Sequence, residues 1–230
     1  MGSQVQKRNY QRELDQIING LAREGRKPRL LLHSCCAPCS SYVLEYLSQY
    51  FQITLYYYNP NIYPAAEYEE RIAEQQRLIG QMAENGGLGA PVELLRGEYV
   101  PEDFYQAVKG READREGGEP CMRCYELRLR EAAGKAAEGG FDYFTTTLSI
   151  SPLKNAGKLN EIGERLAADY KVPYLVSDFK KKNGYKRSTE LSGRYGLYRQ
   201  DYCGCVYSLK ERRAGEEKGK NAGPDTGCEQ

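Results

Sequence analysis

The sequence predicts an α/β fold in which a mostly parallel, five-stranded sheet carries helices on both faces. Short apolar runs that suit strands alternate with longer stretches whose apolar residues recur at helical spacing. This alternation is typical of sheets whose parallel strands are joined by helices. A chain of 230 residues is long enough to bury one sizeable core, and the sequence has no internal repeat. We therefore expect a single domain over residues 1–210.

Each element has a local signal in the sequence. Ser40 or Ser41 is expected to cap the helix that follows the first strand, because serine accepts hydrogen bonds from a first helical turn. Gly86-Gly87 is expected to end the longest helix. The predicted strands cover residues 29–34, 53–59, 92–98, 141–150 and 173–178. The predicted helices cover residues 9–23 (within an N-terminal segment, 1–26), 40–50, 65–85, a short stretch after Pro101, 120–138 and 156–170.

Composition narrows the class of protein. The net charge of +1 gives no overall attraction to nucleic acid or membrane, so a polyanion site has to be a local patch. The sequence shows no apolar signal run and no stretch of about 18 apolar residues, which predicts a cytoplasmic protein with no membrane partner. Residues 214–230 have no periodicity and are expected to form a disordered tail.

Seven of the eight cysteines lie in three clusters, which is the most informative feature of the sequence. A reducing compartment argues against a structural disulfide framework, so these thiols are available for metal ligation or redox chemistry. His33 is the only histidine, which excludes zinc sites of the two-cysteine, two-histidine kind. Thiols at such spacings can converge on one metal or one redox pair.

The first cluster is Cys35, Cys36 and Cys39 in HSCCAPCSS, directly after the first predicted strand. In open α/β sheets this turn lies at the carboxyl edge, where ligands bind. The turn contains no glycine, so it does not predict a phosphate-binding loop. Amides at a helix N-terminus favour the thiolate, which is the form that binds metal. The alternative is that one or two of these thiols are small buried apolar groups.

The second cluster is the pair Cys121 and Cys124 in GEPCMRCYE, next to Pro120 at a predicted helix start. Residues three apart lie on one face of a helical turn, so both thiols can chelate one metal or cluster. Alone, the pair is compatible with a zinc site, an iron–sulfur ligand set or a dithiol. With two thiols from the first cluster it gives four sulfur ligands, which both zinc and a [4Fe–4S] cluster accept.

The third cluster is Cys203-Gly204-Cys205 in DYCGCVY. In an extended segment residues i and i+2 have Cα atoms about 6.5–7 Å apart, at the limit of disulfide reach. Gly204 allows the backbone to bend and close that gap. Such a small ring predicts a strained, easily reduced bond, and hence a redox pair. Two further metal ligands, or an inert pair, are the alternatives.

A basic run follows the last predicted strand. A run of charge is usually a solvated loop. Here it lies at the sheet edge that carries the cysteines, and tyrosines that could stack on bases follow it. We therefore consider five of its residues as contacts to RNA phosphates: Lys180, Lys181, Lys182, Lys186 and Arg187.

Taken together, several segments of this sequence resemble the non-cobalamin, QueH-type epoxyqueuosine reductases. The segments are LLHSCCAPC, YYYNPNIYP, GEPCMRCYELRL, FTTTLSISPLKN, and the run from DFKKKNGYKRS to YRQDYCGCVYS. The resemblance covers about residues 28–210 and implies a relative of the adenine-nucleotide α-hydrolase-like (HUP) fold.

The resemblance also implies an activity, namely the reduction of epoxyqueuosine to queuosine at the wobble position of tRNA. It implies a [4Fe–4S] cluster on Cys35, Cys36, Cys121 and Cys124, and a redox-active pair at Cys203 and Cys205. A further mononuclear iron near the cluster is expected of some members, with Cys39 as a candidate ligand. No strong nicotinamide or flavin motif is present, so an external electron donor, which the sequence does not identify, has to act.

Two other classes of protein are compatible with parts of the pattern. One is an ATP-using or thiolating tRNA-modification enzyme on the same fold, which the missing glycine-rich phosphate turn disfavours. The other is a zinc-stabilised RNA-binding module without catalysis, which leaves the CGC pair unexplained.

Overall fold

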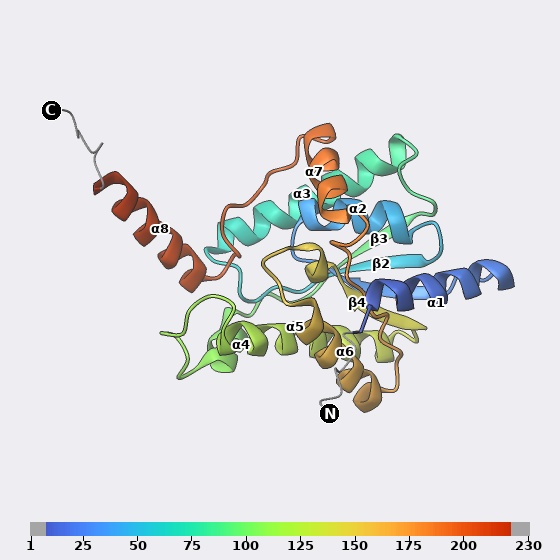
Figure 1. Cartoon of the computed structure of the whole chain (residues 1–230), viewed down its shortest axis with the longest axis horizontal. Coiled ribbons are helices and arrows are strands. Elements are labelled where there is room, and N and C mark those ends of the chain that lie inside the picture. The colour runs from blue at the N-terminus through green and yellow to red at the C-terminus, as the bar shows by residue number, and fades with distance from the viewer. Residues whose placement is uncertain (1–7, 222–230) are drawn as a thin grey trace, which may run out of the picture.

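The computed structural model describes residues 8–221, with side chains described up to residue 215, and it has an α/β fold (Figure 1). The sheet has four strands, all parallel, in the order β3-β2-β1-β4. Leu31 at the centre of β1 is in register with Thr54 of β2 and Phe144 of β4. The strands are β1 (Arg29–His33), β2 (Gln52–Tyr57), β3 (Val92–Arg96) and β4 (Tyr143–Thr146).

The predicted fifth strand, 173–178, is not part of this sheet, so the prediction of five strands was wrong. The segment runs beside β4 but forms only an isolated parallel bridge, between Phe144 and Tyr174. Further along, Asn160 takes the place of a strand partner: its side chain accepts from the backbone N–H of Ser177 at 2.9 Å and donates to the backbone carbonyl of Ser177 at 2.8 Å. The likeness to the HUP fold stays a prediction.

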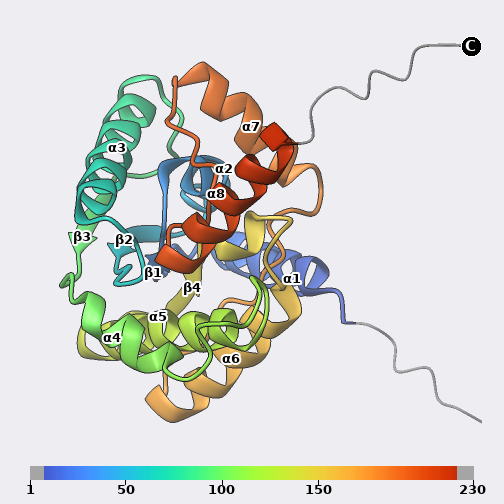
Figure 2. The same ribbon diagram turned by 90° about the vertical axis from the view of Figure 1, so that its left-hand side faces the viewer.

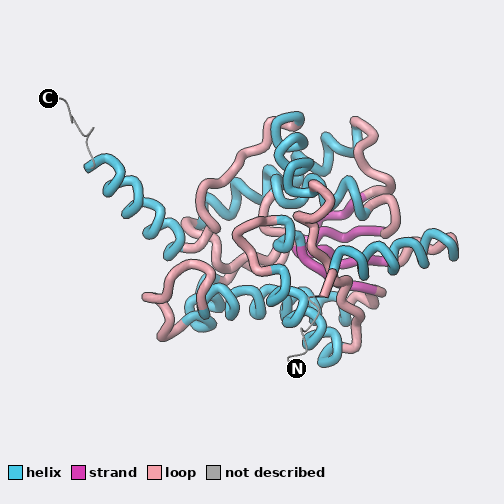
Figure 3. The backbone as a smooth tube through the Cα atoms, viewed as in Figure 1, coloured by secondary structure: helices cyan, strands magenta, loops and turns pink. Residues whose placement is uncertain are grey.

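Helices cover both faces of the sheet, as expected from the alternating pattern. In Figures 1 and 2, α2, α3 and α7 lie on one side of the strands and α4, α5 and α6 on the other. Figure 3 shows the strands (magenta) enclosed by helices (cyan). The helices are α1 (Tyr10–Glu24), α2 (Ala37–Leu47), α3 (Ala65–Glu84), α4 (Pro101–Val108), α5 (Glu119–Glu138), the 3-10 helix η1 (Thr147–Ile150), α6 (Ala156–Tyr170), α7 (Gly184–Arg194) and α8 (Val206–Asn221).

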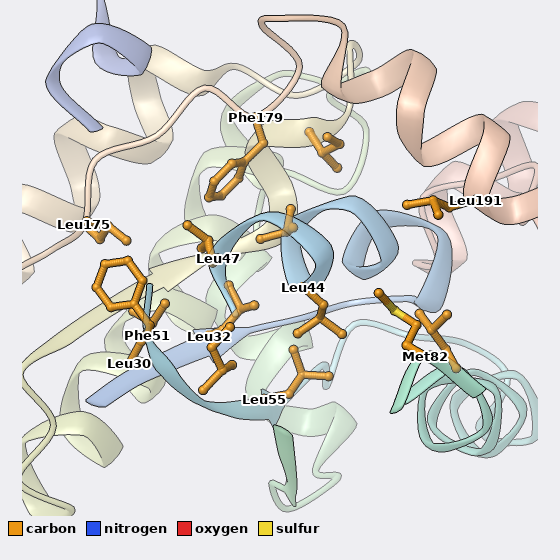
Figure 4. Close-up of a cluster of buried hydrophobic side chains, with 14 of the residues drawn as sticks. Leu30, Leu32, Leu44, Leu47, Phe51, Leu55, Met82, Leu175, Phe179 and Leu191 are labelled. Carbon is orange, nitrogen blue, oxygen red and sulfur yellow. The ribbon is translucent and has the colours of Figure 1, made fainter. Parts of the chain in front are cut away.

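The core is divided by the sheet, because successive side chains of a strand point to opposite faces. Leu30 and Leu32 of β1 pack with Leu44 of α2 and Met82 of α3 in one cluster (Figure 4). Leu31, between them, belongs to the other cluster, which α5 and α6 cover. The continuous apolar run of β1 is therefore the signature of a strand buried on both faces.

Several predicted boundaries differ from the observed ones. Helix α2 begins at Ala37 with Cys36 as its N-cap residue, so the predicted cap at Ser40 or Ser41 was wrong. The predicted strand 141–150 is divided into β4 and η1, because the Thr146 side chain accepts from the N–H of Leu148 and starts a helical turn.

Other differences lie near the two ends of the chain. The first helix ends where Gly25 adopts a left-handed conformation, and residues 1–7 lie outside the described part. The basic run continues into α7, which was not predicted. Helical backbone of α8 extends to Asn221, so residues 214–221 of the predicted tail are helical, and residues 222–230 lie outside the described part. Within residues 8–221, no helix combines the length and the apolar character that a membrane span requires.

Candidate metal and redox site

The three thiols of the first cluster converge at the carboxyl end of β1, as the sequence predicts. Cys36 is the N-cap residue of α2 and Cys39 is its third residue, and side chains at these two positions of a helix start lie next to each other. The Sγ atoms of Cys35, Cys36 and Cys39 lie within 4.8 Å of one another, with Cys35 and Cys36 3.7 Å apart. Within residues 8–221 this is the one group of three or more His, Cys, Asp or Glu side chains that lie close enough together to hold a metal ion.

The rest of the turn is fixed by hydrogen bonds. Ser34 is buried, its hydroxyl lies 2.5 Å from that of Ser40, and it donates to Gln75 of α3 at 3.0 Å. The backbone carbonyl of Ser34 accepts from the side chain of Asn59 at 2.8 Å. The cluster therefore stands on a rigid base formed by β1, α2 and α3.

The pKa values of the three thiols are shifted in different directions. Hydrogen bonds from Cys36 and then Cys39 hold the pKa of Cys35 well below its usual range, with Arg128 adding to the effect. The interaction with Cys35 raises the pKa of Cys36 to about 12, and that of Cys39 lies well above its usual range for the same reason. A metal would take the place of the shared protons, because thiolates are the form that ligates.

The second pair lies in the first turn of α5. Cys121 accepts a hydrogen bond from the N–H of Gly117 at 3.2 Å. Cys124 is buried, and burial raises the pKa of its thiol to about 11. Both thiols line a small cavity of about 30 Å³, together with Cys203 and Cys205. The structure thus brings the second pair to the third one, and the triplet lies in an adjoining, larger cavity.

The CGC segment lies between α7 and α8, and its two thiols are free. Gly204 has φ +116°, a conformation that favours glycine. A Cβ atom at this position would lie 3.0 Å from Nη1 of Arg71 and 3.3 Å from Cγ1 of Ile62. The carbonyl of Gly204 accepts from the N–H of Tyr63 at 2.8 Å, which fixes the segment against the chain that precedes α3.

The larger cavity, of about 600 Å³, joins the first and third cysteine clusters. Its lining includes all three thiols of the triplet, while Cys203 lines both this cavity and the smaller one. Cys205 lines only the smaller one. Among the cysteines, Cys203 alone lines both cavities, together with Glu116, Lys154, Ser208 and Glu211.

Two buried arginines and one half-buried lysine surround the thiols, and the sequence-based interpretation did not include them. Lys154 donates to Sγ of Cys203 at 2.8 Å. Arg128 donates to the backbone carbonyl of Cys124 at 3.2 Å, and Arg71, 2% exposed, forms an ion pair with Glu67 at 2.7 Å. In the part of the chain that the structure describes, Nη2 of Arg71 is buried without a hydrogen-bond partner, although Arg71 lines the larger cavity.

These cations are balanced by sulfur. Burial lowers the pKa of Lys154 and Arg128, yet both end above their ordinary values because the Cys203 thiol, and for Arg128 also Cys124 and Cys35, favour the charged forms. Arg71 shows the same effect from Cys36 and Glu67. A site with several thiols and several buried positive charges fits a group that carries net negative charge, such as a thiolate-bound metal cluster.

His33 is buried and structural. Its Nε2 lies 3.0 Å from the carbonyl of Tyr58 and so donates, and its Nδ1 lies 2.9 Å from the hydroxyl of Thr146 and accepts. Burial lowers the pKa of His33 to about 4, so it is neutral at physiological pH. The ring therefore supports the end of β1 and is not directed at a metal.

The basic run is largely paired with carboxylates. Its side chains form ion pairs with acids on neighbouring elements: Lys180 with Asp178 (2.6 Å), Lys182 with Asp15 (2.6 Å), and Arg187 with Glu45 (2.7 Å) and Glu190 (3.1 Å). Lys181 and Lys186 are exposed and have no such partner among the described residues. None of the five lines either cavity.

Two of the three missed cations had a signal in the sequence. Glu67 and Arg71 are four residues apart on a predicted helix, which is the spacing of an ion pair. Arg128 lies four residues after Cys124, so it belongs to the same face of α5. Lys154 has no comparable local signal, because only the fold brings the loop after η1 to the CGC segment.

Known proteins resemble this chain over most of its length. The sequence matches the family described as "Epoxyqueuosine reductase QueH" over residues 30–211. The epoxyqueuosine reductase QueH of Streptococcus pyogenes is 45% identical over 205 residues, which cover 89% of this chain and 80% of that protein. The protein of the same name from Staphylococcus epidermidis is 45% identical over 209 residues (90% and 87%), and that from Thermotoga maritima is 36% identical over 190 residues (80% and 92%). The predicted relationship is confirmed: this chain belongs to the epoxyqueuosine reductase QueH family.

Proposed function

We propose that this protein reduces epoxyqueuosine to queuosine at the wobble position of tRNA. The observation that carries the proposal, beside the family, is the arrangement of the thiols. Seven cysteines from three distant segments line two adjoining cavities, and Cys203 lines both of them. Neither a rigid zinc module nor a phosphate-binding turn requires a free thiol at such a junction.

We further propose that Cys35, Cys36, Cys121 and Cys124 hold a [4Fe–4S] cluster, with Cys39 available to a mononuclear iron beside it. The close triplet and the buried cations support this assignment, because they suit a thiolate-rich, negatively charged group. When bound, the cluster and iron would supply single-electron transfer and a Lewis acid for the epoxide oxygen.

The residues of the CGC segment supply the electron pair. Converting an epoxide to an alkene consumes two electrons and two protons and releases water. Oxidation of the Cys203 and Cys205 thiols to a disulfide releases two electrons and two protons, so the two half-reactions balance. Lys154 and Glu116, in contact at 3.6 Å beside Cys203, are placed to hold a proton in transit.

The larger cavity is the site for the modified nucleoside. Its volume of about 600 Å³ lies in the range of small-molecule sites. Tyr185, 41% exposed at its rim, offers an aromatic face to a base, and Arg199 offers a guanidinium to a phosphate. The proposed phosphate contacts also include Lys180, Lys181, Lys182, Lys186 and Arg187, with Lys181 and Lys186 the least engaged within the protein.

The experiment is a conversion assay on the anaerobically purified protein. Iron and acid-labile sulfide are measured first, and the protein is then incubated with epoxyqueuosine-containing tRNA and a reductant. Mass spectrometry of digested nucleosides should show queuosine formed at the expense of the epoxide. A protein that contains iron and sulfide, binds the tRNA and still leaves the epoxide intact would overturn the proposal.

A further inference from the structure

The two thiols of the CGC segment have different surroundings. Cys203 lines both cavities and accepts a hydrogen bond from Lys154 at 2.8 Å. Cys205 lines only the small cavity and packs against a cluster that contains Phe104, Val108 and Cys124. Their positions and contacts therefore separate two residues that the CGC sequence makes equivalent.

A closed ring of contacts fixes Lys154 relative to Cys203. The Lys154 ammonium donates to Sγ of Cys203 and lies 3.6 Å from one oxygen of Glu116. The other oxygen of Glu116 accepts from the hydroxyl of Ser208 at 2.9 Å, and that hydroxyl accepts from the N–H of Cys203 at 3.0 Å. Three segments, the loop after η1, the loop before α5 and the start of α8, thus hold one ammonium–sulfur contact.

The other charges near this contact do not replace Lys154. From α5, Cys121, Cys124 and Tyr125 face the pair and are acids, so their ionisation would oppose a thiolate at Cys203. Arg128 of α5 is a second cation within electrostatic reach, but it is hydrogen-bonded to the backbone of Cys124. Among these groups, Lys154 is the cation in hydrogen-bond contact with Cys203. Its side chain is only 9% exposed, so solvent screens that contact little.

We propose that Lys154 is a positioning residue that holds Cys203 as the exchanging thiol of the pair, with Cys205 as the leaving thiol on the side of the smaller cavity, and that a thiol reductant recharges the pair through the larger cavity. The proposal rests on the dithiol role given above.

The exchange balances with a thiol as the reductant. A thiolate RS⁻ attacks Sγ of Cys203 in the disulfide, the bond between Cys203 and Cys205 breaks, and Cys205 leaves and takes up a proton. A second RS⁻ attacks the sulfur of the bound R group, and Cys203 leaves as a thiolate beside Lys154. The sum is two thiols oxidised to RSSR and one protein disulfide reduced. Lys154 stabilises the leaving group of the second step, which shortens the life of the mixed disulfide.

The first test compares the two thiols in cluster-loaded protein without tRNA. Cys205→Ser leaves Cys203, and Cys203→Ser leaves Cys205. Each variant is treated with iodoacetamide at neutral pH, and peptide mass spectrometry measures how fast its remaining CGC cysteine is alkylated. We expect Cys203 to react at least about tenfold faster, because it lines the larger cavity and contacts the Lys154 ammonium, whereas Cys205 lines only the smaller cavity. Equal rates, or a faster Cys205, would overturn the proposal even if no Lys154 variant could be folded.

The second test changes the lysine in the Cys205→Ser background. Lys154→Met should slow alkylation of Cys203 by about tenfold and move its pH profile to higher pH, and Lys154→Arg should restore most of the rate. Lys158→Met, on the exposed start of α6 where Lys158 pairs with Glu161, is the matched control and should change neither. A Lys154→Met protein with wild-type iron and an unchanged pH profile would overturn the proposal.

These readouts do not depend on tRNA turnover. A protein that leaves epoxyqueuosine-containing tRNA unchanged but shows the predicted order of thiol reactivity would remove the proposed function and support the assignment of Lys154. A protein that converts the tRNA but shows no lysine dependence would do the reverse.

Discussion

The triplet turn and the CGC segment both present thiols to the larger cavity, but they are built differently. The triplet lies between a buried strand and a buried helix, and Ser34, Ser40 and Gln75 form a hydrogen-bonded base under it. The CGC segment lies in a loop, where Gly204 is fixed through its backbone to Tyr63. Regular structure on both sides suits a fixed ligand set. A loop outside regular structure, held by individual hydrogen bonds, suits the role proposed for this pair, in which two thiols form and break a bond.

The groups that contact sulfur also differ between the triplet and the CGC segment. In the triplet, thiols hydrogen-bond to one another, so the anionic character is shared among potential ligands. In the CGC segment, Sγ of Cys203 accepts a hydrogen bond from the ammonium group of Lys154. This difference supports the proposal that the thiols in contact with one another bind metal, whereas the thiol in contact with an ammonium group takes part in exchange.

The largest expected effect is the loss of repeated turnover when the proposed redox pair, Cys203 and Cys205, is broken. Cys203→Ser and Cys205→Ser should each lower multiple turnover of epoxyqueuosine-containing tRNA by about a hundredfold or more, because one thiol cannot store an electron pair. Nucleoside mass spectrometry measures the yield per enzyme. Cys228→Ser, which lies outside the three motifs, is the control. Wild-type yields from either CGC variant would reduce this segment to a structural role.

The next effect concerns Arg71, which lines the larger cavity together with the triplet and lies close to Gly204. Its buried ion pair with Glu67 loses one partner in Arg71→Met, and an uncompensated buried carboxylate costs about 3–5 kcal/mol of unfolding free energy. Urea denaturation measures this change. Arg96→Met removes the exposed pair with Glu69 and should cost no more than about 1 kcal/mol. Equal losses of unfolding free energy in the two variants would contradict a stabilising role for the buried Arg71–Glu67 pair.

A smaller effect is expected from the backbone of the CGC segment. Gly204→Ala introduces a Cβ close to Arg71 and Ile62 at a positive φ, and such strain costs about 1–3 kcal/mol. The expected result is a lower unfolding free energy with unchanged iron content. Gly193→Ala in α7 is the control, because nothing lies within 4 Å of its added Cβ. If Ala is accepted equally at both positions, the segment is less constrained than its geometry indicates.

The smallest effect concerns the stretch of chain that precedes the CGC segment, which Glu74 of α3 contacts at Tyr198. Glu74 accepts from Arg77 and from the N–H of Tyr198, and these bonds, the one from Arg77 first, lower its pKa. The unfolded state therefore binds more protons at acidic pH, so this stability is present above the ordinary carboxyl pKa and lost as pH falls through the folded value. Glu74→Gln should reduce the loss of unfolding free energy at acidic pH, measured by urea denaturation at several pH values, by less than about 1 kcal/mol. An unchanged loss would mean that Glu74 does not anchor the segment.

The sequence predicted those parts of the fold in which local signals agree with the tertiary structure. Helix α3 was predicted almost to the residue, because its apolar stripe runs unbroken to the glycines at 86 and 87. Helix α7 was missed, because its start depends on Gly184, whose missing Cβ allows the chain to approach the carbonyl of Phe179. The fifth strand failed because Asn160, distant in sequence, occupies the backbone groups of Ser177.

Some features of the candidate site likewise have a local signal in the sequence, whereas others depend on the fold. The cysteine clusters and their order identified the family from the sequence, because close thiol spacing is a local property. The contacts of Lys154 with Cys203, and of Arg71 with Gly204, join segments far apart in the chain, so no local pattern could predict them. The mixed lining of the two cavities is likewise a product of the fold.

The central claim, that one set of thiols ligates and the other exchanges, is tested most directly by iron and acid-labile sulfide in two anaerobically purified variants. Cys124→Ser removes a proposed ligand, and Cys203→Ser removes a proposed redox thiol that lines the same small cavity. We predict that Cys124→Ser loses most of its iron and sulfide, because a cluster lacking one thiolate is labile, while Cys203→Ser keeps wild-type amounts. Loss of the cluster from Cys203→Ser, or its full retention in Cys124→Ser, would contradict the account.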